Sequence, residues 1–371
     1  MAEAKKTLER TRAEHDARWG AAVPAVRAGR RLGALVAGAK AYLGQYLNLQ
    51  EEVEGEARVG MIFNPPLAEA VLDGLVAALD GQPPPRPEDI ARDQLAGREM
   101  PLGYVFLAGA DLRVRALGAG ALLGLPEAVR RALCCYALAV PTDHVHGWEP
   151  LLWRAEPALT AHALWQYWQP FLAAGHRRPP GLYRVLGEPG LRAVAARLLL
   201  PVLGRRRAGD WRGLRELLAA ALSLADRSDL LALVRQAAGR EGAVPRERVH
   251  WLAAGFLLAP GEFAGPLAAY CGHSKEKILP LLDFVAPLLG PGGACADALS
   301  DRALAQLLRI IGPVFPPAAP EAGAEPDRIS LRVSELFRAF QRRRGPEAEA
   351  ARAWLRSIRV MRRCAAALGG P

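Results

Sequence analysis

Two segments approach catalytic motifs without completing them. A phosphate-binding loop needs G-x-x-x-x-G-K-[ST], so that backbone amides and a lysine surround the phosphates. The segment Gly33–Ala41 reads GALVAGAKA, with one residue too many before Lys40 and no Ser or Thr after it. A nucleophile elbow needs G-x-S-x-G after a strand, but Gly272-His273-Ser274 lacks the second glycine and follows a helical pattern. We therefore expect neither nucleotide binding nor serine hydrolase chemistry.

One short cluster resembles a set of metal ligands. His144 and His146 are two residues apart, directly after Asp143. Two histidines at this spacing can share a metal in a strand or loop, but no H-E-x-x-H or C-x-x-C completes a four-ligand set. A polar loop between helices, following Pro141, is the alternative. An enzyme that uses His144, His146 or Ser274 is one hypothesis. The sequence favours instead a protein without catalytic residues, metal or cofactor.

Aromatic and basic residues suggest a binding surface instead. Four of the eight tryptophans lie within 21 residues, and Trp and Arg are enriched where proteins bind one another. Aromatic packing between adjacent helices is the alternative. The residues predicted to contact a partner are Trp148, Trp153, Trp165, Trp168, Arg205, Arg206, Arg207, Arg342, Arg343 and Arg344.

Charge is distributed unevenly along the 371 residues. The formal net charge is +10, but acidic residues outnumber basic ones over residues 51–95. Residues 328–363 contain eleven arginines and three acidic residues, and residues 192–215 contain seven arginines and one acidic residue. Such basic stretches attract nucleic acid or an acidic protein, unless they are simply the solvated faces of helices. Five cysteines, an odd number without C-x-x-C spacing, favour a reducing compartment.

The elements that must position these residues are helices. Apolar residues recur at helical spacing, as in Trp211, Leu214, Leu218, Ala221 and Ala225, and only Tyr104–Leu107 suggests a strand. Ser300 is placed to cap a helix that ends before Gly312-Pro313. The expected helix starts are near residues 127, 149, 190, 211, 229, 246, 262, 275, 300, 330 and 347.

The spacing of these starts indicates how the helices are arranged. Pairs of helices recur roughly every 35–45 residues, the range of two-helix HEAT-like repeats. The sequence therefore predicts an all-α fold, an irregular HEAT-like α-solenoid of stacked antiparallel helix pairs, with a compact helix bundle as the alternative.

Proline-rich segments suggest where the chain divides. Gln82–Glu88 reads QPPPRPE and Pro316–Pro326 reads PPAAPEAGAEP. Both compositions are typical of extended linkers, although the first is also typical of a loop between helices. We predict an N-terminal helical segment (1–95), a helical-repeat domain (96–315), and a linker with basic C-terminal helices (316–371).

Four longer segments together resemble part of a known protein family. They are Trp148–Trp165 (WEPLLWRAEPALTAHALW), Gly181–Leu203, Arg248–Gly272 (RVHWLAAGFLLAPGEFAGPLAAYCG) and Leu307–Pro317 (LLRIIGPVFPP). In this order they resemble the C-terminal helical-repeat region of bacterial NACHT-type STAND signalling NTPases, many of them implicated in anti-phage defence. The resemblance implies a sensor or regulatory scaffold. The chain departs from the family where the NTPase module would be, because no P-loop is recognisable.

These observations together predict a non-enzymatic interaction module. The expected partner is a protein, an NTPase or an effector, and nucleic-acid binding through the arginine-rich stretches is the alternative. No apolar run reaches the roughly 18–20 residues of a membrane span, and the polar start lacks the apolar core of a secretory signal. We therefore expect no membrane partner and a cytoplasmic protein.

Overall fold

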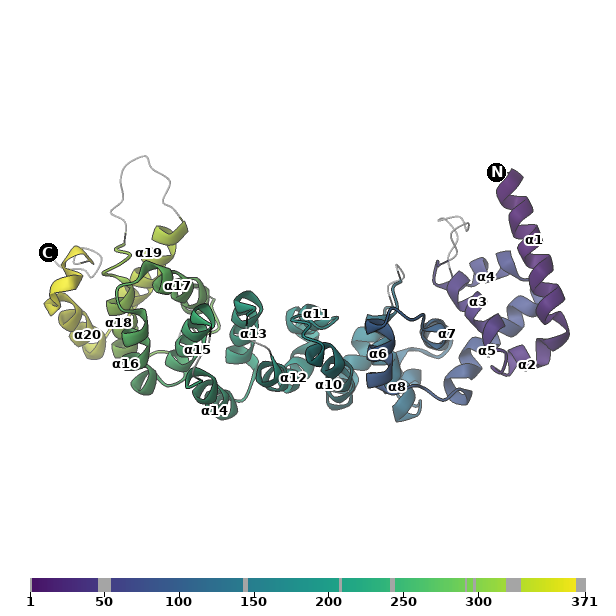
Figure 1. Cartoon of the computed structure of the whole chain (residues 1–371), viewed down its shortest axis with the longest axis horizontal. Coiled ribbons are helices and arrows are strands. Elements are labelled where there is room, and N and C mark those ends of the chain that lie inside the picture. The colour runs from purple at the N-terminus through teal and green to yellow at the C-terminus, as the bar shows by residue number, and fades with distance from the viewer. Residues whose placement is uncertain are drawn as a thin grey trace. The chain divides into compact units, whose positions relative to one another are not determined.

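The structure is a computed structural model that describes residues 2–45, 55–142, 146–206, 209–240, 244–290, 292–295, 298–317 and 328–364. Within these ranges the chain is all-helical and contains no strand. It divides into two compact units, residues 1–195 (unit 1) and residues 196–371 (unit 2). Figure 1 shows the helices in chain order.

The described part of unit 1 contains eleven α-helices and part of a twelfth. Their bounds are α1 (Ala2–Trp19), α2 (Val23–Arg27), α3 (Leu32–Tyr42), α4 (Glu56–Ile62), α5 (Pro65–Gly81), α6 (Pro87–Leu95), α7 (Pro101–Leu117), α8 (Glu127–Ala139), α9 (Glu149–Ala155), α10 (Pro157–Ala173), α11 (Leu182–Gly187) and α12 (Arg192–Arg205), with short 3-10 turns at Gly20–Ala22, Ala119–Leu122 and Pro189–Leu191.

The core of unit 1 depends on close approach between helices. Helix α7 packs against α3, α5 and α8, and α10 packs against α6 and α8. A Cβ atom added at Gly109 of α7 would lie 2.3 Å from the backbone oxygen of Leu75 on α5, so only glycine allows this contact. The candidate strand Tyr104–Leu107 lies inside α7, where Val105, Phe106 and Leu107 are buried against neighbouring helices and Tyr104 is partly exposed.

In the part of unit 2 that the structure describes, eight further α-helices follow α12. Their bounds are α13 (Trp211–Leu224), α14 (Arg227–Ala238), α15 (Pro245–Leu258), α16 (Pro260–Cys271), α17 (Lys275–Leu289), α18 (Asp301–Ile311), α19 (Arg328–Arg342) and α20 (Pro346–Ser357), followed by a 3-10 helix at Arg359–Cys364.

Helices two apart in sequence pack together in unit 2. Helix α15 contacts α13 and α17, and α17 contacts α19; in the same way α16 contacts α18, and α18 contacts α20 (Figure 1). Consecutive helices also contact one another from α13 to α19.

The predicted helix starts from residue 127 onward lie within two residues of observed ones. The predicted cap is also confirmed, since the Ser300 hydroxyl accepts a hydrogen bond from the Ala303 amide at 3.2 Å. From residue 127 onward, two of the described helices were not predicted. Helix α10 follows α9 after the single residue Glu156, so one apolar pattern covers both, and α11 has only six residues.

The division of the chain differs from the predicted one. Residues 82–86 are a loop between α5 and α6, and α6 packs on α8 and α10 of the same unit. Helices α19 and α20 pack on α17 and α18 rather than forming a separate domain. Most of the linker Pro316–Pro326 lies outside the described residues. Within the described ranges, no helix is both long and apolar enough to cross a bilayer.

Candidate partner-binding groove

Helix α15 is the central element of unit 2. It contacts α13, α14, α16 and α17, and every residue from Val249 to Leu258 is buried. Both ends of the helix are fixed by side chains from its neighbours. Arg227 of α14 donates to the backbone oxygen of Leu258 at 2.7 Å, and the Tyr270 hydroxyl of α16 donates to that of Pro245 at 2.8 Å. Capping of the last carbonyls by a cation stabilises a helix end.

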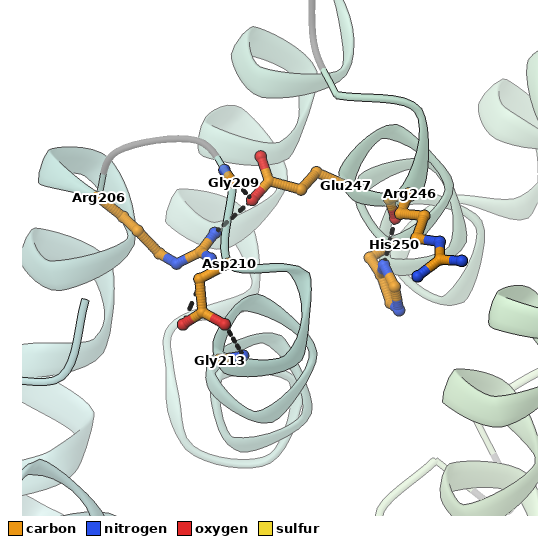
Figure 2. Close-up of polar contacts among 7 residues, drawn as sticks. All are labelled: Arg206, Gly209, Asp210, Gly213, Arg246, Glu247 and His250. Carbon is orange, nitrogen blue, oxygen red and sulfur yellow. Dashed lines mark hydrogen bonds and ion pairs between the residues drawn. The ribbon is translucent and has the colours of Figure 1, made fainter.

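A buried polar network fixes the chain before α13 to the first turn of α15 (Figure 2). Glu247 accepts hydrogen bonds from Arg206 at 3.2 Å and from the Gly209 amide at 2.9 Å. The Asp210 carboxylate caps α13 through the Gly213 amide at 3.1 Å, with an Arg206 nitrogen 3.8 Å away. The Arg206 and Glu247 side chains are only 7% and 6% exposed. Buried charges must be paired in this way to be tolerated.

His250, one turn further along α15, is neutral in this setting. Its Nδ1 lies 2.5 Å from the backbone oxygen of Arg246 (Figure 2), and its ring meets Phe284 edge-on. Burial, together with the charges of Arg215 and Arg206, lowers the pKa of His250 to about 4. A neutral imidazole is therefore part of the folded core at neutral pH.

A surface groove of about 540 Å³ lies over α15, between α14 and α16. Its apolar part includes Leu252 and Phe263, and its small residues include Ala238, Gly239 and Ala269. The remaining lining residues are Arg235, Arg248, Glu262, Pro266 and Tyr270. We call this the α14–α16 groove. A volume of this size is in the range of ligand-binding clefts.

Two cations flank the aromatic residue of the groove. The guanidinium carbon of Arg248 lies 5.2 Å from the centroid of the Tyr270 ring, and the Lys277 ammonium lies 4.5 Å from it. Lys277 also donates to the backbone oxygen of Tyr270 at 3.0 Å. Across the described residues, neither Arg248 nor Lys277 forms an ion pair. Both charges are thus available to an anion at this position.

An ion pair joins the two walls of the groove. Arg235 of α14 donates to both carboxylate oxygens of Glu262 on α16, with nitrogen–oxygen distances of 2.7–3.1 Å. Hydrogen bonding to Arg235 lowers the pKa of Glu262, which is therefore ionised at neutral pH. Both side chains are about half exposed, so the pair can open at small energetic cost.

The predicted tryptophan surface is mostly core. Trp148, Trp153 and Trp168 are 0–1% exposed, and only Trp165 is partly exposed. The Trp168 indole donates to the backbone oxygen of Pro180 at 2.8 Å, and Arg184 lies over Trp153. These three side chains are not available to a partner, because each fills space between helices of unit 1. The alternative of aromatic packing describes them.

The predicted arginines separate into two groups. Arg205, Arg342 and Arg344 are exposed. Arg206 belongs to the buried network, and Arg343 pairs with Asp301 at 3.0 Å, so both hold helices together. Arg207 lies outside the described residues.

Of the histidine cluster, Asp143 and His144 lie outside the described residues. The Nδ1 atom of His146 is 3.6 Å from Asp111, whose other oxygen accepts the Tyr42 hydroxyl at 3.0 Å. His146 and Asp111 are both buried, so a substrate would have to displace packed side chains to reach them. Among the described residues, no group of three potential ligands could hold a metal ion.

The remaining nucleophile candidates are helix or core residues. Ser274 immediately precedes α17 in unit 2, whereas His146 belongs to unit 1. The five cysteines are all free and buried, and burial raises the pKa of each thiol, to about 12 for Cys134 and about 11 for Cys271 and Cys364. Such thiols are poor nucleophiles.

No family model matches the chain, and neither a curated protein nor a solved structure matches it.

The groove itself was not predicted from the sequence. Its key residues Arg248, Tyr270 and Lys277 come from three different helices. No helical spacing relates Tyr270 to Lys277, because α16 ends at Cys271 and Gly272 breaks the helix before α17, so the sequence carries no local signal for the groove.

Proposed function

We propose that this protein is a non-enzymatic helical scaffold that binds another protein, in the manner of a sensor or adaptor. The observation that supports this most directly is the α14–α16 groove, which combines an apolar floor with unshared positive charge. Apolar centres with charged rims are typical of protein-binding surfaces. The described lining residues include no Ser, Thr, Cys or His, and their one carboxylate, Glu262, is paired with Arg235.

The packing of unit 2 is consistent with HEAT-like helix pairs. Contacts between helices two apart, in the series α13–α15–α17–α19 and α16–α18–α20, are those expected when each pair stacks on the next. In this proposal the helix pairs are the scaffold and the groove is one contact surface on it. The resemblance to the repeat region of NACHT-type NTPases adds a class of partner, a signalling NTPase or effector.

Capture of partners by the tagged full-length protein tests the proposal. We would compare capture at about 50 and 200 mM salt, with and without nuclease, against a tag-only control. A protein recovered in proportion to the bait, resistant to nuclease and to the higher salt, supports the proposal. Recovery of nucleic acid alone, or of nothing above the control, overturns it.

Nucleic-acid binding is the second candidate, favoured by the charge of unit 2. Residues 196–371 contain 26 basic and 17 acidic residues, a net charge of +9 out of the +10 of the whole chain. If this surface binds duplex DNA, the logarithm of the affinity falls linearly with the logarithm of the salt concentration. Each phosphate contacted adds about 0.9 to the magnitude of the slope. The double variant Arg342→Glu/Arg344→Glu should then reduce the slope by about 2. An unchanged slope counts against these residues as phosphate ligands.

A further inference from the structure

The α14–α16 groove presents two kinds of surface side by side. Leu252 and Phe263 are apolar and only 5% exposed each, so a partner must insert a side chain between the walls to cover them. Arg248 lines the groove beside this floor, and Lys277, which is near the same Tyr270 ring, adds a second positive charge outside the lining. A complementary ligand therefore carries a carboxylate close to an apolar side chain.

Glu262 is a carboxylate of the chain itself at the same groove. It neutralises Arg235, another cation beside the floor, through hydrogen bonds to both of its carboxylate oxygens. An incoming carboxylate would compete with Glu262 for this guanidinium, because both need the same donors. Glu262 thus lowers the affinity of the groove for anions.

The same arrangement disfavours a nucleic-acid ligand. Phosphate backbones are bound by rows of cations that follow the strand. Here the two unshared cations are at a single aromatic ring, and an ionised carboxylate lines the same groove. The walls contain Ala238, Gly239 and Ala269, which leave room for a narrow chain.

We propose that the α14–α16 groove binds an extended acidic segment of a partner protein. A carboxylate of that segment pairs with Arg248, which lines the groove, while a neighbouring apolar side chain covers Leu252 and Phe263. Glu262 acts as an internal competitor that limits the affinity. This inference rests on the proposed function and specifies the chemistry of the partner.

The test uses the full-length protein and a fluorescein-labelled peptide of alternating glutamate and leucine, followed by fluorescence anisotropy. The same peptide with glutamine in place of glutamate reports the contribution of charge, and a labelled oligodeoxythymidylate tests the nucleic-acid alternative. Arg248→Glu is compared with Arg338→Glu, an exposed arginine of α19 with the same charge change. Glu262→Gln is compared with Glu349→Gln, an exposed glutamate of α20.

We expect the glutamate peptide to bind more tightly than the glutamine peptide. Arg248→Glu should weaken binding roughly tenfold, since it removes a charge-assisted contact and adds repulsion. Glu262→Gln should tighten binding roughly threefold, the effect of opening an exposed ion pair. Loss of the folded groove lowers affinity for the peptide, so a gain of affinity in this variant separates the proposal from a folding defect. The two control variants should change affinity less than about twofold.

The inference is overturned if Glu262→Gln does not tighten peptide binding and Arg248→Glu weakens it no more than Arg338→Glu does. It is also overturned if the oligodeoxythymidylate binds and the peptide does not. Capture of a nuclease-resistant protein together with failure of the peptide would refute only the acidic-segment inference. Peptide binding as expected, without any captured protein, would refute the proposed function and leave the chemistry of the groove supported.

Discussion

Arg205 and Arg206 are adjacent arginines in opposite environments. Arg205 is exposed at the end of α12, whereas the Arg206 side chain is 7% exposed and paired with Glu247. Sequence gives both residues the same charge and the same predicted role. Their difference depends on Glu247, which is 41 residues away from Arg206, and only the packing of α13 against α15 brings the two together. Buried ionic partners of this kind cannot be inferred from local spacing.

Replacing Arg206 by methionine should destabilise the protein strongly. Glu247 would keep the Gly209 amide but lose its cation in a buried site. Removing one partner of a buried pair costs about 3–5 kcal/mol, and urea unfolding measures it. Arg205→Met should change the free energy of unfolding by less than about 0.5 kcal/mol. The double variant Arg206→Met/Glu247→Leu should recover at least half of the loss, and equal instability of single and double variants would contradict this account.

His250 should make stability depend on pH below neutrality. The unfolded imidazole has a pKa near 6.5, and the folded one has a pKa of about 4. Between these values the unfolded state binds more protons, so the free energy of unfolding decreases as pH falls from 6.5 towards 4 and is unaffected by this group above 6.5. Between pH 7 and pH 5, the free energy of unfolding should fall by about 2 kcal/mol more in the wild type than in His250→Gln. Parallel pH profiles for the two proteins would contradict the assignment.

At the scale of the helix, α15 is distinguished by how closely α16 approaches it. A Cβ atom added at Gly255 would lie 2.4 Å from the Phe263 ring, which lines the groove. Gly265, on α16, has nothing within 4 Å of such an atom. The same substitution in two neighbouring helices therefore has opposite consequences.

Gly255→Ala should destabilise the protein by about 1–3 kcal/mol, because the Phe263 ring must move. Gly265→Ala should stabilise it by about 0.5–1 kcal/mol through helix propensity. Thermal unfolding followed by circular dichroism measures both changes. Effects of the same sign would show that the contact between α15 and α16 is looser than described.

The helices could be predicted from sequence to a greater extent than the groove. Proline at the first turn, as at Pro245 and Pro346, and caps such as Ser300 and Asp226 define helix starts locally. The burial of α15 on all sides has a local signal as well, since Val249–Leu258 is apolar except for His250, a composition typical of a helix without a solvent face. The division at residues 195/196 was not marked by proline, because α12 continues across it.

At the scale of the molecule, charge is distributed between the two units very unequally. Unit 2 carries +9, and unit 1 carries +1 from 22 basic and 21 acidic residues. Net charge of one sign destabilises a compact state through self-repulsion, and salt screens that repulsion. Sequence composition predicted a basic protein, but the assignment of the charge to one unit needed the structure.

Raising salt from about 20 to 200 mM should therefore stabilise unit 2 more than unit 1. Hydrogen exchange measured by mass spectrometry can follow both units in one sample. Peptides of α13–α20 should gain protection with salt, while peptides of α3–α10 should change little. A uniform response of the two units would contradict a repulsion confined to unit 2.

Because all five cysteines are buried, the native protein is suited to site-directed labelling at an introduced cysteine. Because their thiols are inaccessible and have raised pKa values, a maleimide should find no competing group in the folded chain. Ala269, an exposed residue of the groove wall, can then be replaced by cysteine and modified selectively with an environment-sensitive dye. The native chain should remain unlabelled under conditions that modify Ala269→Cys completely. Such a reporter would follow occupancy of the groove in real time.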